Sequence, residues 1–238
     1  MQTADPVPPL DASALAFFLV CWCGYAIVVR RAQSPGTGLM ATMHKNRIAW
    51  MRQMAMRENR IVDTSIVNTL CNGSAFFAST SLIAIGGAAT LLRATDDALR
   101  LFADLPLVPS FSRGMWEIKA VGLLVIFGYA FFKFAWSYRL FNYAAILVGA
   151  TPLPNAPDTA ARLAAADRAA EMTVVAGSNF AAGQRAFFFS FAYLGWFLGP
   201  LVLIGATLLI AVVVWRRQFR SDALDALTVG SIDEGAMR

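Results

Sequence analysis

The stretch IKAVGLLVIFGYAFFKFAWSYRLFNYAAILVGA, residues 118–150, is the longest apolar segment of the chain. A helix needs roughly 20 apolar residues to cross a hydrocarbon core of about 30 Å. We therefore predict a membrane span at residues 118–142, with the remaining turns protruding or lying at the interface. Similar stretches at residues 10–29, 66–92 and 186–215 predict three more spans. The predicted fold class is all-α, an integral membrane bundle of four transmembrane helices.

The composition agrees with a membrane protein. Of the 238 residues, 58% are hydrophobic, whereas soluble domains usually contain about 45–50% apolar residues. The net charge is +5, and because most basic residues flank the apolar stretches, we expect them to meet membrane lipid and not nucleic acid. The residues before the first stretch lack the basic start of a secretory signal, so that stretch is expected to remain as a helix.

Two helices are predicted outside the bilayer core. Residues 39–65 have helical periodicity but too many charges to span, which indicates a basic amphipathic helix at the interface. Residues 158–183 are Ala-rich and mostly polar, which indicates a helix on the cytoplasmic side. With the four spans they form one membrane domain, residues 1–220, followed by a polar tail at residues 221–238.

Basic residues near the span ends predict the topology, because they gather on the cytoplasmic side. With the N-terminus outside, the cytoplasmic side receives Arg30, Arg31, Lys45, Arg47, Arg52, Arg57, Arg60, Arg139, Arg162, Arg168 and Arg185. The other side receives Arg93, Arg100, Arg113, Arg216, Arg217 and Arg220. We therefore expect a protein of the bacterial inner membrane with both termini outside. The two arginines directly after the fourth stretch argue for the opposite placement of the C-terminus.

Basic residues of the amphipathic segment are candidates for binding lipid phosphate. They are Lys45, Arg47, Arg52, Arg57 and Arg60. Glu58 falls on the apolar side of this segment, where an unpaired carboxylate is costly, so we predict an ion pair with a basic residue such as Arg139. The alternative is a solvated face with side chains that snorkel toward water.

Polar residues within the second and third spans form the candidate binding site. Asn72 and Ser79 belong to one small and polar stripe, and Lys119, Tyr129 and Lys133 share one face of the third span. Lys133 lies near the middle of its apolar stretch, where a bare ammonium is costly. It either snorkels to the interface, binds an anion together with its polar neighbours, or forms a structural ion pair. The candidate binding residues are Lys133, Tyr129, Asn72, Ser79, Glu58 and Arg139.

The fourth span contains a glycine pair followed by proline. Gly195 and Gly199 have the spacing of the GxxxG helix-contact pattern and precede Pro200. We predict a packing seam with a kink at this point.

Enzyme, metal and cofactor motifs are absent from the sequence. The only histidine is His44, and there is no HExxH motif, phosphate-binding glycine loop or nucleophile elbow. His44 with Met40, Met43 and Met51 would suit copper(I), but methionine on a buried face more often serves packing. No metal, no cofactor and no catalytic residue is predicted.

Three functional hypotheses follow. The first is a non-enzymatic membrane protein that forms a homo-oligomer or binds a membrane-protein partner, and that holds anionic lipid on its basic helix. The second is an oligomeric anion channel or carrier with Lys133 in the path. The third is a lipid-acting membrane enzyme with Glu58 and His44 as acid and base. The first is the prediction.

Five short motifs occur in order along the chain: HxNRxxWM at residues 44–51, NGSAFFAST at 72–80, AFF at 130–132, RLFN at 139–142 and WFLGP at 196–200. Their order and spacing resemble an uncharacterised membrane-protein family of bacteria and plants, known only as a domain of unknown function. The resemblance covers about residues 10–220. It implies a multi-span membrane protein, and it implies no activity, substrate or catalytic residue.

Overall fold

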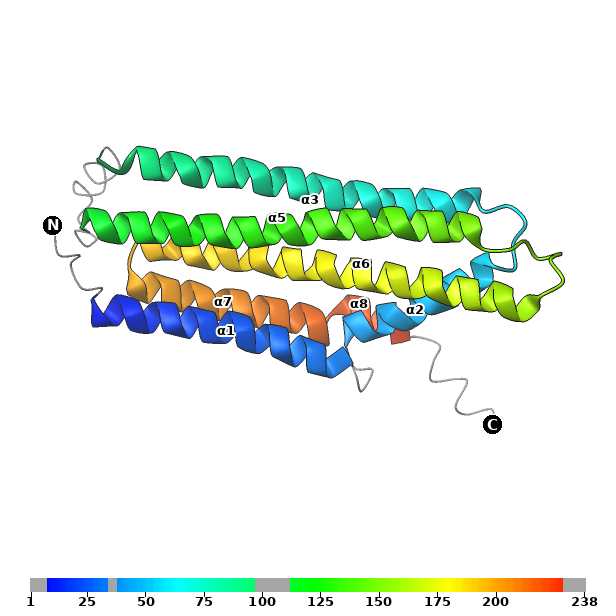
Figure 1. Ribbon diagram of the computed structural model, residues 1–238. Helices are drawn as coiled ribbons and strands as arrows, with labels where there is room; N and C mark the ends of the chain where they lie inside the picture. Colours follow the sequence, from blue (N-terminus) through cyan, green and yellow to red (C-terminus); the bar gives the residue numbers. More distant parts are fainter. Residues whose placement is uncertain (1–7, 34–37, 97–111, 229–238) are drawn as a thin grey trace. The chain divides into compact units, whose positions relative to one another are not determined.

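The structure is a computed structural model that describes residues 8–33, 38–96 and 112–228, and every regular element in these ranges is helical (Figure 1). The elements are α1 (Pro9–Gln33), α2 (Leu39–Met54), α3 (Ile61–Arg93), α5 (Arg113–Ala150), α6 (Thr159–Leu194), the 3₁₀ turn η1 (Gly195–Phe197), α7 (Pro200–Phe219) and α8 (Asp222–Thr228). Four segments are long and apolar enough to cross a membrane: Pro9–Ala32, Ile61–Arg93, Arg113–Ala150 and Pro200–Leu227. The predicted all-α class is confirmed, and four helices are long and apolar enough to span a membrane.

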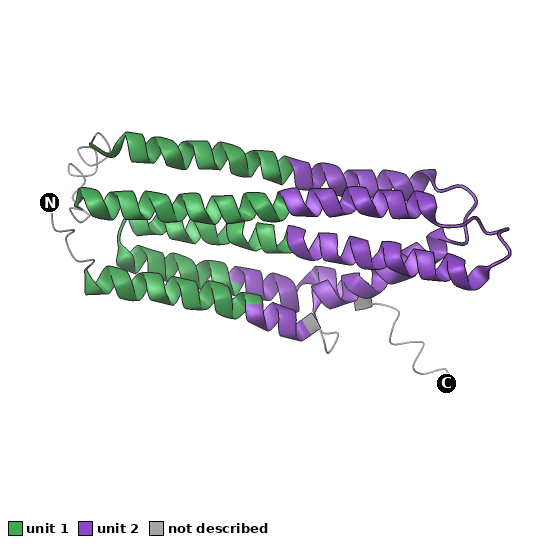
Figure 2. Ribbon diagram, in the orientation of Figure 1, with its two compact units in different colours: residues 1–26, 76–134, 181–212 green, residues 27–75, 135–180, 213–238 purple. Residues whose placement is uncertain are grey.

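The helices divide into two compact units (Figure 2). Unit 1 contains residues 1–26, 76–134 and 181–212, and unit 2 contains residues 27–75, 135–180 and 213–238. Five helices, α1, α3, α5, α6 and α7, contribute residues to both units. The sequence suggests one membrane domain without such a division, because the boundaries fall inside continuous helices where no linker composition marks them.

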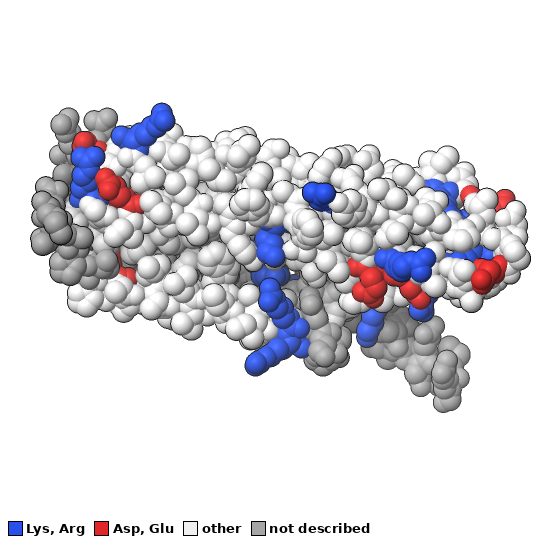
Figure 3. All heavy atoms as spheres, in the orientation of Figure 1, with Lys and Arg blue, Asp and Glu red and all other residues white. Residues whose placement is uncertain are grey.

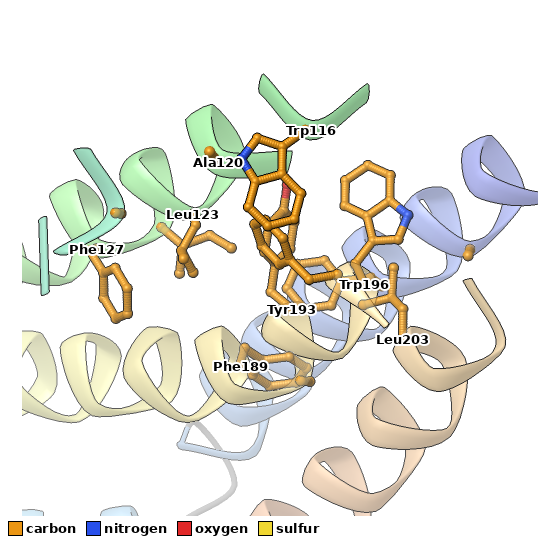
Figure 4. Packing of buried hydrophobic residues seen from close by; sticks show 14 of the residues in the cluster. Trp116, Ala120, Leu123, Phe127, Phe189, Tyr193, Trp196 and Leu203 are labelled. Carbon is orange, nitrogen blue, oxygen red and sulfur yellow. The ribbon is translucent and has the colours of Figure 1, made fainter. Parts of the chain in front are cut away.

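Unit 1 has an aromatic core built from α1, α5 and α6 (Figure 4). The ring of Phe18 lies 5.4 Å from that of Tyr193 and 5.9 Å from that of Phe189, measured between centroids. All three side chains are buried. Large apolar residues also cover the outer surface of unit 1, and Ile83 of α3 is 77% exposed. An apolar exterior of this kind is what a lipid environment requires.

The fourth predicted span, residues 186–215, is not a single helix. α6 passes into the turn η1, and the chain reverses at Gly199 before α7 begins at Pro200. Gly199 has φ 143°, a conformation that favours glycine, and proline suits the first position of a helix. The predicted extramembrane helix 158–183 is also part of α6, which continues to Leu194. The glycine and proline that suggested a kink therefore end one helix and start another.

Unit 2 is organised around α2, which ends earlier than predicted. The buried cluster contains Met51 and Met54 of α2 with Phe141 of α5. The predicted interfacial helix 39–65 ends at Met54, and α3 begins at Ile61 and not at the predicted residue 66. The side chain of Asn59 accepts a hydrogen bond from the Ile61 N–H at 3.0 Å, which stabilises the start of α3. This cap and the bend before it explain the difference.

The predicted polar tail, residues 221–238, begins with a short helix. α8 contacts α2 in unit 2. The backbone of Gly38, which has φ 86°, lies against Gln218 and Phe219 at the end of α7. Residues 229–238, like Arg100, lie outside the described residues.

Candidate functional site

An open groove of about 680 Å³ lies on unit 2 between the first turns of α3 and the second half of α5. Its lining combines one guanidinium, hydroxyl and amide groups, a thiol and three small or branched apolar residues. The lining residues are Arg60, Ile61, Thr64, Ser65, Val67, Asn68, Cys71, Asn142 and Ala145. Residues spaced by three or four positions share one helix face, which explains why the first turns of α3 present their polar side chains together.

Arg60 is the cationic residue of the groove, and backbone carbonyls hold its side chain. Its Nη1 donates to the carbonyls of Val148 at 3.1 Å and Thr151 at 2.5 Å, and its Nη2 donates to the carbonyl of Pro152 at 2.6 Å. The Nε atom is buried and has no hydrogen-bond partner in the described part of the chain. No carboxylate among the described residues lies within 4.0 Å of Arg60. The guanidinium therefore caps the end of α5 while its charge is not neutralised by an acid.

A buried carboxylate fixes the bend beside the groove. Asp63 is fully buried. Its Oδ1 accepts hydrogen bonds from the indole of Trp50 and the guanidinium of Arg57, both at 2.8 Å. Its Oδ2 is buried with no partner in the described residues. These contacts join the end of α2 to the start of α3. They also position Arg60, three residues before Asp63, beside the C-terminal end of α5.

Most basic residues predicted to bind lipid phosphate instead contact the protein. Arg47 donates to the carbonyl of Thr173 on α6, and its guanidinium lies 5.9 Å from the centroid of the Phe141 ring. Burial lowers the pKa of Arg47. Lys45 is exposed. The basic face of α2 therefore packs largely on α6, a contact that the predicted interfacial position did not include.

Arg52 forms an exposed ion pair with Asp167 of α6, at 2.8 Å. The hydrogen bond from Arg52 holds the pKa of Asp167 below its ordinary value, and the same bond raises the pKa of Arg52. A lowered carboxyl pKa stabilises the fold above the ordinary value of about 3.9, and this contribution is lost as the pH falls through the lowered pKa. The pair therefore holds α2 to α6 at neutral pH, weakly because both groups are exposed.

The predicted binding residues of the spans are divided between the two units. Lys133 is half-buried, with its Nζ 5.7 Å from the centroid of the Tyr129 ring in unit 1. Asn72 of unit 2 and Ser79 of unit 1 are both exposed.

The predicted ion pair between Glu58 and Arg139 is not formed. Glu58 is exposed, and Arg139 donates from Nε to the hydroxyl of Tyr143 at 2.6 Å. His44 Nε2 lies 3.8 Å from a carboxylate oxygen of Glu171, and not beside Glu58. Glu58 was predicted on the apolar side of a helix at residues 39–65, but α2 ends at Met54. Because the chain bends there, Glu58 does not belong to the apolar face of α2 and reaches solvent.

A buried charge cluster in unit 1 was not predicted. Lys119 is fully buried; its Nζ donates to the carbonyl of Trp196 at 2.8 Å and lies 3.6 Å from Oδ1 of Asp11. The indole of Trp196 donates to the same Asp11 oxygen at 2.6 Å. Lys133 on this helix face was the predicted functional lysine, and not Lys119. The only sequence signal for this cluster was a second lysine on the same face of the third span. Asp11 gave no signal of its own, because an aspartate near the start of a helix is also expected as a helix cap.

A family model matches residues 13–223 of the chain and is described as "Protein of unknown function, DUF599". No curated protein and no solved structure matches the chain. The family resemblance predicted from the five motifs is confirmed as a family of unknown function. The family match gives no activity, so the proposed function rests on the geometry of the groove.

Proposed function

The chain belongs to the DUF599 family, whose function is unknown, and from its groove we propose that it is an integral membrane protein that binds an anionic lipid headgroup. The observation that carries this proposal is Arg60, a cation at the groove with no carboxylate among the described residues within 4.0 Å. Its Nε–H is buried and unused. A phosphate or carboxylate oxygen near this guanidinium would supply the missing countercharge.

Polar groups on α3 extend the site beyond Arg60. The side chains of Ser65 and Asn68 line the groove, are exposed, and have no hydrogen-bond partner in the described residues. Both can donate to an oxygen of the ligand. The first turn of α3 also faces the groove, and the N-terminus of a helix favours negative charge. The charge of Arg60 and the helix N-terminus favour an anion over a cation.

The surroundings favour a lipid over a soluble anion. The groove lies on the sides of α3 and α5, two of the helices that are long and apolar enough to span a membrane. Ile61, which lines it, is 73% exposed, and Ile146 of α5, one position from the lining residue Ala145, is 65% exposed. A polar centre with an apolar rim matches an amphiphile, whose acyl chains can lie along the helices while its headgroup binds inside.

In this proposal the lipid binds in the groove and not on the basic face of α2. Arg47, Arg52 and Arg57 use their guanidinium groups within the protein, so they add little to lipid binding. An anion path through Lys133 stays an alternative proposal, in which the Tyr129 ring, 5.7 Å from the Lys133 Nζ, would line the path. A lipid-acting enzyme also has less support, since His44 pairs with Glu171 and not with Glu58.

Lipid binding can be measured by the stabilisation of the purified protein in detergent. A ligand that binds the folded state raises the unfolding midpoint by mass action. We expect phosphatidylglycerol to raise the midpoint in a concentration-dependent manner, and phosphatidylcholine to raise it much less. Inorganic phosphate serves as the soluble anion. Stabilisation by phosphate equal to that by phosphatidylglycerol would assign the groove to a free anion and contradict lipid binding.

A double variant tests whether the groove is the site. Ser65→Ala with Asn68→Leu removes two donors without touching the contacts of Arg60, and should weaken phosphatidylglycerol binding about tenfold or more, because a hydrogen bond to a charged group contributes about 1.5–3 kcal/mol. Arg139→Gln is the matched control, since Arg139 is an exposed cation of α5 that does not line the groove. Equal loss in both variants would indicate non-specific surface attraction and would exclude the groove.

A further inference from the structure

We infer that the chain crosses the membrane five times, with the second half of α6 as the additional crossing and the C-terminal segment on the same side as α2. This inference is independent of lipid binding in the groove. It contradicts the predicted placement of both termini outside, which assumed four crossings. Three observations support it: the packing of unit 1, the contacts of α8 in unit 2 and the distribution of arginine.

One end of unit 1 is defined by the buried charge cluster. Asp11 comes from the start of α1, Lys119 from the first turns of α5, and Trp196 from the turn after α6. At the same end, Trp116 donates from its indole to the carbonyl of Leu91 near the end of α3, at 3.1 Å. Helices α1 and α5 therefore begin at this end, and α3 and α6 finish there. Helix α7 starts there as well, because only Leu198 and Gly199 separate it from η1.

The opposite end of unit 1 is defined by aromatic contacts. The ring of Trp22 lies 5.8 Å from that of Tyr129, and the ring of Phe77 lies 5.2 Å from that of Phe134. Gly183 of α6 packs so closely on Phe134 that an added methyl would lie 2.7 Å from its ring. α1, α3, α5 and α6 thus run side by side between the two ends. The part of α6 in unit 1 with its turn, residues 181–197, would cover about 25 Å at 1.5 Å per residue, close to the thickness of a hydrocarbon core.

The second half of α6 lies in the centre of unit 1, although α6 is not among the helices that hydropathy identifies as candidate spans. Ala182, Ala186, Phe189 and Ala192 are buried in the bundle. Between residues 181 and 194 the exposed side chains, Phe191 and Leu194, are apolar. A helix shielded by its neighbours needs small residues for close packing more than it needs a strongly apolar surface. Such a helix can cross the bilayer although its hydropathy is low.

Unit 2 places the C-terminal segment beside α2 by separate contacts. α8 contacts α2, and an added methyl at Gly38, just before α2, would lie 3.2 Å from atoms of both Gln218 and Phe219. With four crossings, α2 and α8 would be on opposite sides of the bilayer and could not touch. Five crossings permit this contact.

The arginine distribution agrees with the same count. Five crossings bring Arg216, Arg217 and Arg220 to the side that already holds Arg30, Arg31 and the basic residues of α2. The side with the fewer basic residues then keeps Arg93, Arg100 and Arg113. The conflict between the arginines after the last span and the positive-inside rule is removed. The face in Figure 3 shows basic side chains gathered over the unit 2 helices, whereas the surface over most of unit 1 is uncharged.

Thiol labelling in sealed membrane vesicles tests the crossing number. Single substitutions Lys45→Cys, Arg220→Cys and Arg113→Cys introduce a thiol at exposed positions of α2, the end of α7 and the start of α5. A membrane-impermeant maleimide is applied to vesicles of one orientation and then to inverted vesicles. We expect Lys45→Cys and Arg220→Cys to react from the same side, to within about twofold, and Arg113→Cys to react from the other side.

The wild-type protein supplies the background of its own cysteines, and labelling after detergent solubilisation gives the total reactive thiol of each variant. Reaction of Arg220→Cys from the side opposite Lys45→Cys would establish four crossings and overturn the inference. Because the assay reads only sidedness, its outcome is separate from lipid affinity.

Discussion

Replacement of Lys119 by methionine is expected to lower the stability of the folded protein by about 3–5 kcal/mol, which is the usual cost of removing one partner from a buried ion pair. The substitution leaves Asp11 buried without its countercharge and removes the hydrogen bond from Lys119 to the carbonyl of Trp196. For a chain of this length the unfolding midpoint should fall by about 6–20 °C. Thermal unfolding in detergent, followed by tryptophan fluorescence, measures the change.

Two variants show whether charge is the cause. Lys133→Met removes a lysine from the same helix at a half-buried position and should change the midpoint little. The double variant Asp11→Asn with Lys119→Met should be more stable than Lys119→Met alone, since no uncompensated charge remains. If Lys119→Met unfolds at the same temperature as Lys133→Met, the cluster does not stabilise unit 1.

The second large effect is expected at Gly122 of α5. An added methyl there would overlap the hydroxyl of Tyr193 and lie 2.7 Å from its Cζ atom. Tyr193 is only 3% exposed and its ring packs on those of Phe18 and Trp196, so it has little room to move. Overpacking of a core usually costs about 1–3 kcal/mol, and Gly122→Ala should lower the unfolding midpoint accordingly.

Gly128→Ala is the matched control on the same helix. An added methyl at Gly128 meets nothing within 4 Å, and alanine is favoured over glycine inside a helix by up to about 1 kcal/mol. The two substitutions should therefore shift the midpoint in opposite directions. Tyr193→Phe should partly restore the stability of Gly122→Ala, because it removes the overlapping hydroxyl. A stabilising Gly122→Ala would show that α5 and α6 are not in close contact here.

The sequence predicts those parts of the fold that depend on local apolar length. α1, α3 and α5 are found where the apolar stretches are long enough to span a bilayer. The predicted bounds of these three spans differ from the helix bounds only at the ends. α6 is missed as a bundle helix because its buried face consists largely of alanine, which adds little hydropathy. The reversal at Gly199 is missed because glycine followed by proline is compatible with both a kink and a helix end.

The candidate site is predicted less well, because its contacts are distant in sequence. Arg60 was among the residues expected to bind lipid phosphate, but its bonds to the carbonyls at the end of α5 depend on the bend after Met54. Lys119 meets Asp11 only through the packing of α1 against α5 and α6. No local pattern encodes such a pairing, so Lys133 and not Lys119 was predicted as the functional lysine of α5.

The central position of α6 has a consequence for biosynthesis. α6 emerges from the ribosome before α7, and its segment in unit 1 carries Gln184 and Arg185, which lower its affinity for lipid on its own. The short turn at Gly199 joins it directly to α7, a strongly apolar helix. If α6 crosses the bilayer as inferred, we expect the two helices to insert as a pair, with α6 held at the insertion site until α7 has been made.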